Sequence, residues 1–288
     1  MESVKGYFDL CVAESCIANG NYEKTISRFY EFGYRTIAIN QVFDEANLQP
    51  TKKKKKGEQR EIEDVVPAPI ALETVKRCED MKIFNRLTIK FANQDIIHKI
   101  MRSANLKKYD LLGILPTTQQ AFQFTCSNID ADIFTFDPQY EKPYKANRKS
   151  YSILIEKGYH FEIPYGHALT SNHHRRNMIH ISHVLHTFSK SRNIIISSNA
   201  VNYMGIRGPY DIINLGYIFG LSEEKCKNSI LNNCRNVYLK SVGRRHGKSV
   251  MFIQDIKEFE EMDINSATES DEEMIKEQPV MKKIKSVN

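Results

Sequence analysis

Short apolar runs alternate with amphipathic stretches along most of the chain, and this alternation predicts strands followed by helices. The clearest unit starts with three isoleucines at 194–196, whose β-branched side chains suit a strand buried on both faces. A polar loop follows, and Gly208-Pro209 then opens a helix that Gly220 ends, because proline lacks the N–H that has no partner at a first helical position. The loop lies at the carboxyl end of the strand, where parallel α/β folds gather their binding and catalytic groups.

The same reasoning assigns the other elements. Further strands are expected at residues 6–12, 34–40, 86–91, 109–115, 132–136, 159–163, 237–240 and 250–253. Further helices are expected at residues 22–32, 94–102, 149–157, 172–190 and 223–233, and over a stretch that follows Thr117 or Thr118 and holds residues 121–125. Repeated β-α units with short connections predict a parallel sheet, and this many in one domain favour a closed (β/α) TIM-like barrel over an open sheet.

One long break, between about residues 41 and 82, interrupts the alternation. It holds five consecutive lysines at 52–56, and like charges in a block repel one another and cannot build a core. We therefore expect a flexible lysine-rich insertion at about 48–64, and the lysine run could also act as a nuclear-import signal. Residues 256–288 are acidic and poor in aromatic residues, which predicts a disordered tail after a barrel domain of residues 1–255.

Charge differs between these two parts of the chain. Residues 255–288 contain 10 acidic and 5 basic side chains, a net charge of −5, whereas the whole chain carries +6. The first 254 residues therefore carry +11. A folded body this basic points to a polyanionic partner, and a soluble basic domain with solvated lysines is the alternative.

Several classes of protein are disfavoured by the sequence. It has no run of about 18 apolar residues, so we expect no transmembrane helix and no membrane partner. The N-terminus, MESVKGYFDL, lacks the charged-then-apolar pattern of a secretory signal. The six cysteines are scattered without CxxC pairs, which argues against a zinc framework and favours a reducing compartment.

Five histidines lie in or near the helix expected at 172–190 and raise the question of a metal site. His180, His183 and His186 step by three and drift around the helix, and no HExxH is present, so surface or boundary histidines are the preferred interpretation. The helix start at residues 172–176 (NHHRR) combines free N–H groups with two arginines and could hold a phosphate. A solvated first turn is an equally good interpretation.

A longer pattern links several of these elements. Near its end the chain carries, in order, ISSNA at 196–200, IRGPYD at 206–211, NL at 214–215, FGLS at 219–222 and NCR at 233–235. Earlier it carries YRTIAIN at 34–40, RLTI at 86–89, YD at 109–110 and the pair Arg175-Arg176. This pattern resembles the barrel-shaped thirty-kilodalton protein subunit family of ribonuclease P and ribonuclease MRP. The resemblance covers most of residues 6–254, IRGPYD is a specific block, and the lysine-rich insertion and the acidic tail lie outside it.

The resemblance implies a barrel related to the metal-dependent phosphoesterases of the polymerase-and-histidinol-phosphatase class. Those enzymes carry H-x-H at the end of the first strand and D-x-H late in the barrel. This chain has Asp9-Leu10-Cys11 near the first position and Ser198-Asn199-Ala200 near the second. Serine and alanine are poor ligands for a catalytic divalent metal, so we expect no metal site, no cofactor and no catalytic residue.

The resemblance further implies a non-catalytic protein subunit of nuclear ribonuclease P, and of ribonuclease MRP, in which RNA holds the catalytic metals. The expected role is to scaffold RNA for 5′ maturation of precursor tRNA, and also for ribosomal RNA processing, in the nucleus and nucleolus. The expected partners are ribonuclease P RNA, precursor tRNA and other ribonuclease P/MRP subunits, especially a small α/β protein. Two alternatives stay open: a metal-dependent phosphoesterase with an altered site (Asp9, His160 and His167), and a binding scaffold that needs no RNA.

Four arginines are candidate RNA contacts, because each lies near a strand end or at the start of a βα helix: Arg86, Arg175, Arg176 and Arg207. The planar guanidinium can bind phosphate oxygens with two hydrogen bonds and stack on a base. For each arginine the alternative is an ion pair that ties loops of the barrel together. Asp211 is the obvious local partner for Arg207.

Overall fold

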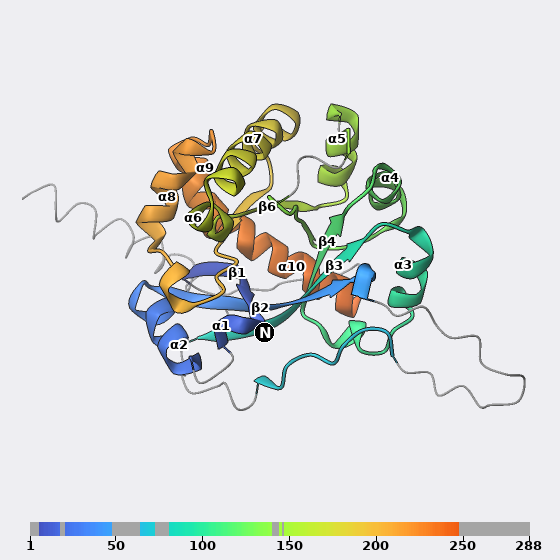
Figure 1. Ribbon diagram of the computed structural model, residues 1–288, viewed down its shortest axis with the longest axis horizontal. Helices are drawn as coiled ribbons and strands as arrows, with labels where there is room; N and C mark the ends of the chain where they lie inside the picture. Colours follow the sequence, from blue (N-terminus) through green and yellow to red (C-terminus); the bar gives the residue numbers. More distant parts are fainter. Residues whose placement is uncertain are drawn as a thin grey trace, which may run out of the picture. The chain divides into compact units, whose positions relative to one another are not determined.

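The computed structural model describes residues 6–17, 21–47, 64–72, 81–139, 144–145 and 147–247. Within these residues one parallel sheet runs in the order β1 to β7, so that each strand pairs with the next along the chain (Figure 1). The strands are β1 (Tyr7–Ala13), β2 (Tyr34–Asp44), β3 (Lys82–Phe91), β4 (Leu111–Pro116), β5 (Ile133–Phe134), β6 (His160–Pro164) and β7 (Ile194–Ser197).

The two edges of this sheet meet, which makes the sheet a nearly closed barrel. The N–H of Asn199 donates to the carbonyl of Cys11 at 2.7 Å, and the N–H of Ala13 donates to the carbonyl of Ala200 at 3.1 Å. Val12 and Ala200 form a parallel bridge at the same place. We call this contact between β1 and the residues after β7 the seam. The predicted α/β TIM-like barrel is confirmed.

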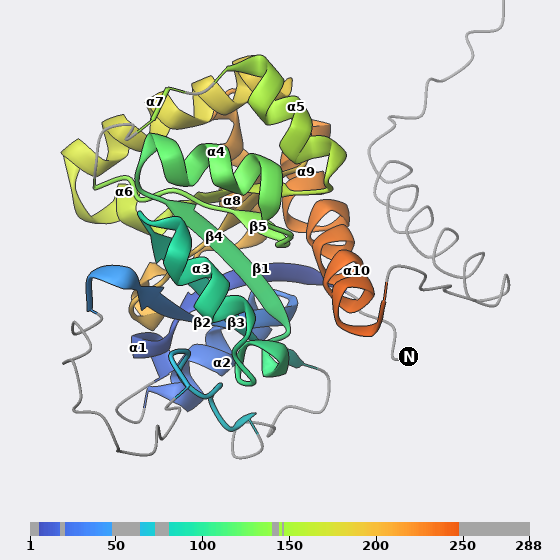
Figure 2. The same cartoon turned by 90° about the vertical axis from the view of Figure 1, so that its right-hand side faces the viewer.

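The helices connect successive strands, and most of them pack on the outer surface of the sheet (Figures 1 and 2). Thr118 caps α4 and Ser171 caps α7, each by accepting a backbone N–H of the first turn, as the sequence predicts. The helices are α1 (Glu14–Ile17), α2 (Tyr22–Glu31), α3 (Gln94–Met101), α4 (Gln119–Asn128), α5 (Arg148–Glu156), α6 (Gly166–Thr170), α7 (Asn172–Ser189), α8 (Pro209–Ile218), α9 (Glu223–Ile230) and α10 (Asn232–His246). Short 3-10 turns lie at η1 (Glu45–Asn47), η3 (Leu106–Lys108) and η4 (Tyr203–Gly205).

The prediction of a strand at 237–240 is wrong, because these residues form the middle of α10. Cys234 and Val237 of α10 are buried against Phe8 and Leu10 of β1 and close the amino-terminal end of the barrel. Their spacing of three residues is helical, but the run Val-Tyr-Leu-Lys is short and β-prone enough to imitate a strand. The strand predicted at 250–253 lies outside the described residues.

Part of the long break after β2 is packed against the barrel. Val66 is buried, and the carbonyl of Pro67 accepts a hydrogen bond from the hydroxyl of Tyr109 at 3.1 Å. Asp64 accepts the backbone N–H of Asn105 at 2.9 Å, which also joins this segment to the turn before β4. The lysine run at 52–56 and the predicted acidic tail lie outside the described residues.

The core around the barrel is apolar, as a closed β/α fold requires. All the cysteines in the described ranges are buried and free of disulfides, in agreement with a packing role: Cys11, Cys16, Cys126, Cys226 and Cys234. Within the same ranges, no helix has the length and apolar character needed to span a bilayer.

Candidate functional site

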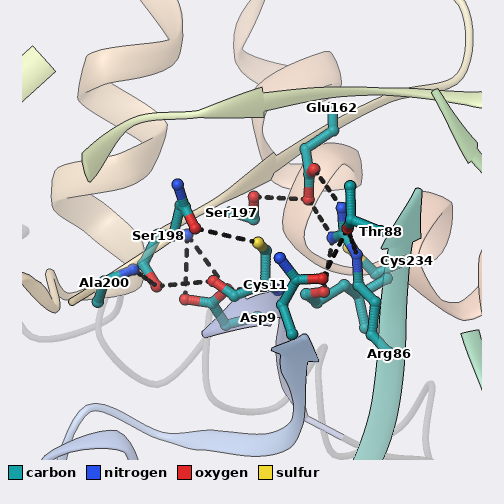
Figure 3. A network of polar contacts seen from close by, with 12 residues as sticks. Asp9, Cys11, Arg86, Thr88, Glu162, Ser197, Ser198, Ala200 and Cys234 are labelled. Carbon is teal, nitrogen blue, oxygen red and sulfur yellow. Dashed lines mark hydrogen bonds and ion pairs between the residues drawn. The ribbon is translucent and has the colours of Figure 1, made fainter. Parts of the chain in front are cut away.

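The barrel interior changes from apolar to polar toward the carboxyl ends of the strands, and an arginine–glutamate pair lies at its centre (Figure 3). Arg86 of β3 donates to both carboxylate oxygens of Glu162 of β6, with Nη1–Oε1 at 2.5 Å and Nη2–Oε2 at 2.6 Å. Nη1 also donates to the carbonyl of Leu10 at 2.8 Å, and Nε donates to the hydroxyl of Thr88 at 3.2 Å. Both partners of the pair are 1% exposed or less, so the pair connects two sides of the barrel away from solvent.

Arg86 and Glu162 both stay ionised because neighbouring groups form hydrogen bonds with their charged atoms. Burial alone would raise the pKa of Glu162, but the ion pair and hydrogen bonds with Arg86 and hydrogen bonds from Ser197 and Thr135 hold it below its usual value. The hydroxyl of Ser197 donates to Oε1 at 2.8 Å. The centre of the barrel therefore contains a neutralised pair of charges and offers little net charge to a ligand.

A second buried carboxylate, Asp9, lies at the seam. It accepts the backbone N–H of Cys11 at 3.1 Å and that of Ser198 at 3.1 and 3.2 Å, and so joins β1 to the residues after β7. Burial raises the pKa of Asp9 to about 6, although the hydrogen bonds from Ser198 and Cys11 act in the opposite direction. Asp9 thus holds the barrel closed through backbone groups.

The seam brings together the two segments that the sequence comparison related to the ligand motifs of the phosphoesterases. The thiol of Cys11 lies 3.5 Å from the side-chain oxygen of Asn199, and the hydroxyl of Ser198 donates to the carbonyl of Cys11 at 3.2 Å. Burial raises the pKa of the Cys11 thiol far above its usual value. With a methyl group at Ala200 and a carboxamide at Asn199, these donors do not fit a divalent metal centre. Across the described ranges, no three His, Cys, Asp or Glu side chains cluster in a way that could hold a metal ion.

The three residues of the phosphoesterase alternative do not converge on one point. His160 begins β6 at the amino-terminal end of the barrel, where burial, with Lys240 nearby, lowers its pKa to about 4. His167 lies on α6 at the opposite end, where its Nε2 is 2.7 Å from Nδ2 of Asn199. Asp9 is fully engaged at the seam. The geometry therefore gives the altered-site enzyme no support.

Among the four candidate RNA contacts, Arg86 needs a correction. Its side chain is 0% exposed and its guanidinium is occupied by Glu162, Leu10 and Thr88, so it is out of reach of a phosphate in this structure. The prediction failed because it placed Arg86 near a strand end, whereas Arg86 lies inside the barrel with its side chain pointing to the axis (Figure 3).

Arg175 and Arg176 lie in the first turns of α7, and both are exposed. Arg175 donates to the carbonyl of Ala168 at 2.9 Å and to the side-chain oxygen of Asn172 at 3.1 Å, which leaves part of its guanidinium free. Arg176 makes no hydrogen bond or ion pair with the described part of the chain. Neither arginine is paired with a carboxylate there, so both charges remain available to an anion.

Arg207 lies in the loop between β7 and α8. Its guanidinium donates to the carbonyl of Met204 at 3.0 Å, and no ion pair with Asp211 forms among the residues that the structure describes. Its backbone also forms hydrogen bonds, since its N–H donates to the hydroxyl of Tyr165 and its carbonyl accepts from the hydroxyl of Tyr34. The main chain of Arg207 thus joins the loop to Tyr34 and Tyr165 of the barrel, and its side chain is half-buried.

Two cavities open at the carboxyl-end face of the barrel. The smaller, of about 200 Å³, has Arg86, Glu162 and His167 among its lining residues. The larger, of about 750 Å³, lies beside it and is lined mainly by apolar and aromatic side chains, among them Phe136 and Ile181. The carboxyl-end face is therefore the hollowed side of the described barrel, as parallel β/α folds lead one to expect.

Sequence reasoning missed Glu162 and the basic end of α10. An acidic residue in the middle of the apolar strand HFEIP was a signal, because a buried carboxylate needs a partner. Arg244 of α10 binds the buried carboxylate of Asp132 at 2.9 Å, and Arg245 binds Asp110 at 2.6 Å. These pairs fix α10 to the amino-terminal ends of β4 and β5.

The family model described as RNase P subunit p30 matches residues 6–246, almost all of the described barrel. The chain belongs to this family. The predicted role as a ribonuclease P protein subunit is thereby confirmed.

Individual relatives agree with this family. The ribonuclease P protein subunit p30 of Mus musculus is 33% identical over 220 residues, which cover 74% of this chain and 78% of the relative. The "Ribonuclease P/MRP protein subunit RPP1" of Saccharomyces cerevisiae is 26% identical over 239 residues, which cover 81% and 75%. Among solved structures, a chain of an archaeal ribonuclease P with mature tRNA matches with a TM-score of 0.59 at 15% identity, over 85% of this chain and 98% of that one. At this identity the match shows a shared fold.

Proposed function

We propose that this p30-family chain is a non-catalytic subunit that scaffolds RNA in nuclear ribonuclease P, for the 5′ maturation of precursor tRNA. The observation that supports the non-catalytic part is the seam, where a thiol at Cys11, a carboxamide at Asn199 and a methyl group at Ala200 offer a poor ligand set for a catalytic divalent metal. Catalysis then belongs to the RNA of the particle, and the protein contributes binding and positioning.

The proposed role beyond ribonuclease P follows from the name of one relative. The name of the yeast relative includes ribonuclease MRP, which supports a second role for this chain in that particle and in ribosomal RNA processing. The proposed partners are the particle's RNA, precursor tRNA and other protein subunits, among them a small α/β protein. The proposed location is the nucleus, including the nucleolus.

The proposed RNA contact is the start of α7. Arg175 and Arg176 are adjacent, exposed and unpaired with carboxylates, and they follow a helix amino terminus whose N–H groups favour anions. Arg207, half-buried beside the same end of the barrel, is the second candidate contact.

The test replaces Arg175 and Arg176 together by alanine and measures binding of the reconstituted protein to ribonuclease P RNA over a range of salt concentrations. We expect weaker binding and a log–log salt slope that is shallower by about one unit per lost phosphate contact. The matched control replaces Lys107 and Lys108, two adjacent exposed cations that precede β4 at the other end of the barrel. An equal loss in the control, or a lower melting temperature without any change in slope, would contradict the assignment.

The non-catalytic role has a separate test. The recombinant chain alone should not turn over RNA or a phosphomonoester with any added divalent metal. Metal-dependent turnover that disappears in Asp9→Ala would show that the seam is an active site after all.

A further inference from the structure

The larger cavity at the carboxyl-end face has the size and the lining of a ligand site. Its volume of about 750 Å³ falls within the range of about 300–1,000 Å³ that is usual for small-molecule sites in proteins. Its lining is mainly apolar with a few polar groups, which is also the usual composition of such sites. The aromatic and aliphatic lining residues include Phe91, Phe134, Phe136, Tyr144, Tyr151 and Ile181.

The aromatic rings of this cavity are held in place by other rings. Tyr144 stacks on Phe122, with ring centroids 4.4 Å apart and an interplanar angle of 4°, and Tyr151 stacks on Phe188 with centroids 5.8 Å apart. Phe134 packs edge-on against Tyr144 at 6.3 Å. Neither tyrosine hydroxyl forms a hydrogen bond with the described part of the chain. The cavity therefore offers a preformed apolar wall to a flat ligand, together with two hydroxyls that can hydrogen-bond with a ligand.

The charged groups of the cavity favour an uncharged ligand over an anion. Lys90 is paired with Asp44, with Nζ and Oδ2 3.0 Å apart. Glu45 accepts two backbone N–H groups, at 2.6 and 3.0 Å. Asp137 adds a third carboxylate, so the described lining carries three negative charges and one positive charge. A phosphate is therefore disfavoured inside the cavity, whereas an uncharged aromatic ring needs no counter-charge there.

The rim of the cavity adjoins the proposed RNA contact at the start of α7. Ile181 lines the cavity and follows Arg176 by five residues, which is about 7.5 Å of helix rise. The side-chain amide of Asn177, the residue after Arg176, donates to the carbonyl of Pro138 at 3.1 Å. Pro138 directly follows Asp137, which lines the cavity. An RNA strand with a phosphate at this helix start therefore passes beside the cavity.

We propose that the larger cavity binds one unstacked base of the RNA whose phosphates contact Arg175 and Arg176. Proteins recognise RNA sequence mainly where bases are unpaired and can stack on aromatic side chains while their edges form hydrogen bonds. The two parts of one nucleotide region are then separated, with the charged phosphate on exposed arginines and the uncharged base among aromatic rings. The proposal rests on the proposed function, which supplies the RNA. It adds a contact to a base, whereas the arginines alone contact only the backbone.

The first experiment places azidophenylalanine at Phe136, a half-buried residue of the lining, in the tagged full-length chain and purifies the assembled particle. The matched control carries the analogue at Phe84, which is also half-buried but stacks on Tyr238 of α10 at 5.0 Å. We expect irradiation to join position 136 to one nucleotide of the RNA, mapped by reverse transcription, and position 84 not to join that nucleotide. An adduct with a protein subunit only, an adduct with a free nucleotide instead of RNA, or no adduct from position 136 would overturn the proposal.

The second experiment measures binding of the full-length chain to the cross-linked RNA, either intact or with that one base removed. We expect removal of the base to weaken binding about tenfold, because stacking on aromatic side chains is lost. The salt slope should not change, because no phosphate contact is lost.

The same pair of RNAs is compared in two variants of the protein. In Phe136→Ala, removal of the base should change affinity by less than about twofold, whereas Phe84→Ala should keep the tenfold loss. Each comparison is made within one protein, so a lower melting temperature of a variant does not affect it. No loss in the unsubstituted protein, or a tenfold loss that persists in Phe136→Ala, would refute the inference. A particle that contains no RNA would refute the proposed function, whereas a particle that contains RNA but gives no adduct refutes only the role of the cavity.

Discussion

The substitution Arg86→Met separates a structural role for this arginine from an RNA contact. It leaves the Glu162 carboxylate buried without the two hydrogen bonds, at 2.5 and 2.6 Å, that satisfy its charge. Removing one partner of a buried pair costs about 3–5 kcal/mol of folding free energy. A domain of this size loses about 2–4 °C of melting temperature per kcal/mol, so we expect a fall of roughly 6–20 °C.

The assay is thermal and urea unfolding of the free protein, followed by circular dichroism. A double variant, Arg86→Met with Glu162→Leu, removes both charges and should recover part of the loss, because an apolar pair of similar volume needs no hydrogen bonds. Arg176→Met, at an exposed position, is the control and should change stability by less than about 0.5 kcal/mol. If Arg86→Met leaves unfolding unchanged but weakens RNA binding, the buried ion pair is not the role of Arg86 and our reasoning fails.

Two further perturbations test the seam and the close packing beside it. The pKa of Asp9 is about 6 in the folded protein and 3.8 as its reference value, so the folded state holds the proton more tightly and stability should fall as the pH rises from 4 to 6. This fall is about 2 kcal/mol between pH 4 and 6, and Asp9→Asn should lack it in urea unfolding at each pH. Parallel curves of stability against pH for the two proteins would show that burial does not shift the pKa of Asp9. Gly166→Ala places a β-carbon 2.3 Å from the carbonyl oxygen of Ser198 and should cost about 1–3 kcal/mol in the same assay. Gly243→Ala, where a β-carbon meets nothing within 4 Å, should be neutral or stabilising, and an equal loss at both glycines would exclude the steric explanation.

The order of strands and helices was predictable because each β-α unit is local in the sequence. The isoleucines of β7 are buried on both faces, and Pro209 starts α8, as the pattern of apolar residues and turn residues indicates. The wrong prediction of a strand within α10 has the opposite cause, because the structure of this segment depends on residues distant in the sequence. Val237 points into the end of a barrel that only tertiary structure creates, and a four-residue apolar run does not distinguish a strand from a helix.

The site was less predictable than the fold. The family resemblance singled out the segments of Cys11 and Asn199 separately, and the structure brings them together at the seam. The burial of Arg86 was not predictable from local sequence, because its partner, Glu162, is 76 residues away and the direction of a strand side chain depends on how the barrel closes.

The seam also constrains the order in which the chain can fold during synthesis. Cys11 leaves the ribosome long before its partner Asn199, which is 188 positions later, and Val237, which packs with Phe8 and Leu10 of the same strand, follows later still. At about 5–20 residues per second, the hydrogen-bonding edge of β1 stays unpaired for roughly ten to forty seconds before its partner is synthesised. An unpaired strand edge is a template for aggregation, and contacts this distant in sequence form slowly. The first strand of the barrel is therefore the segment of the nascent chain that most needs shielding by chaperones.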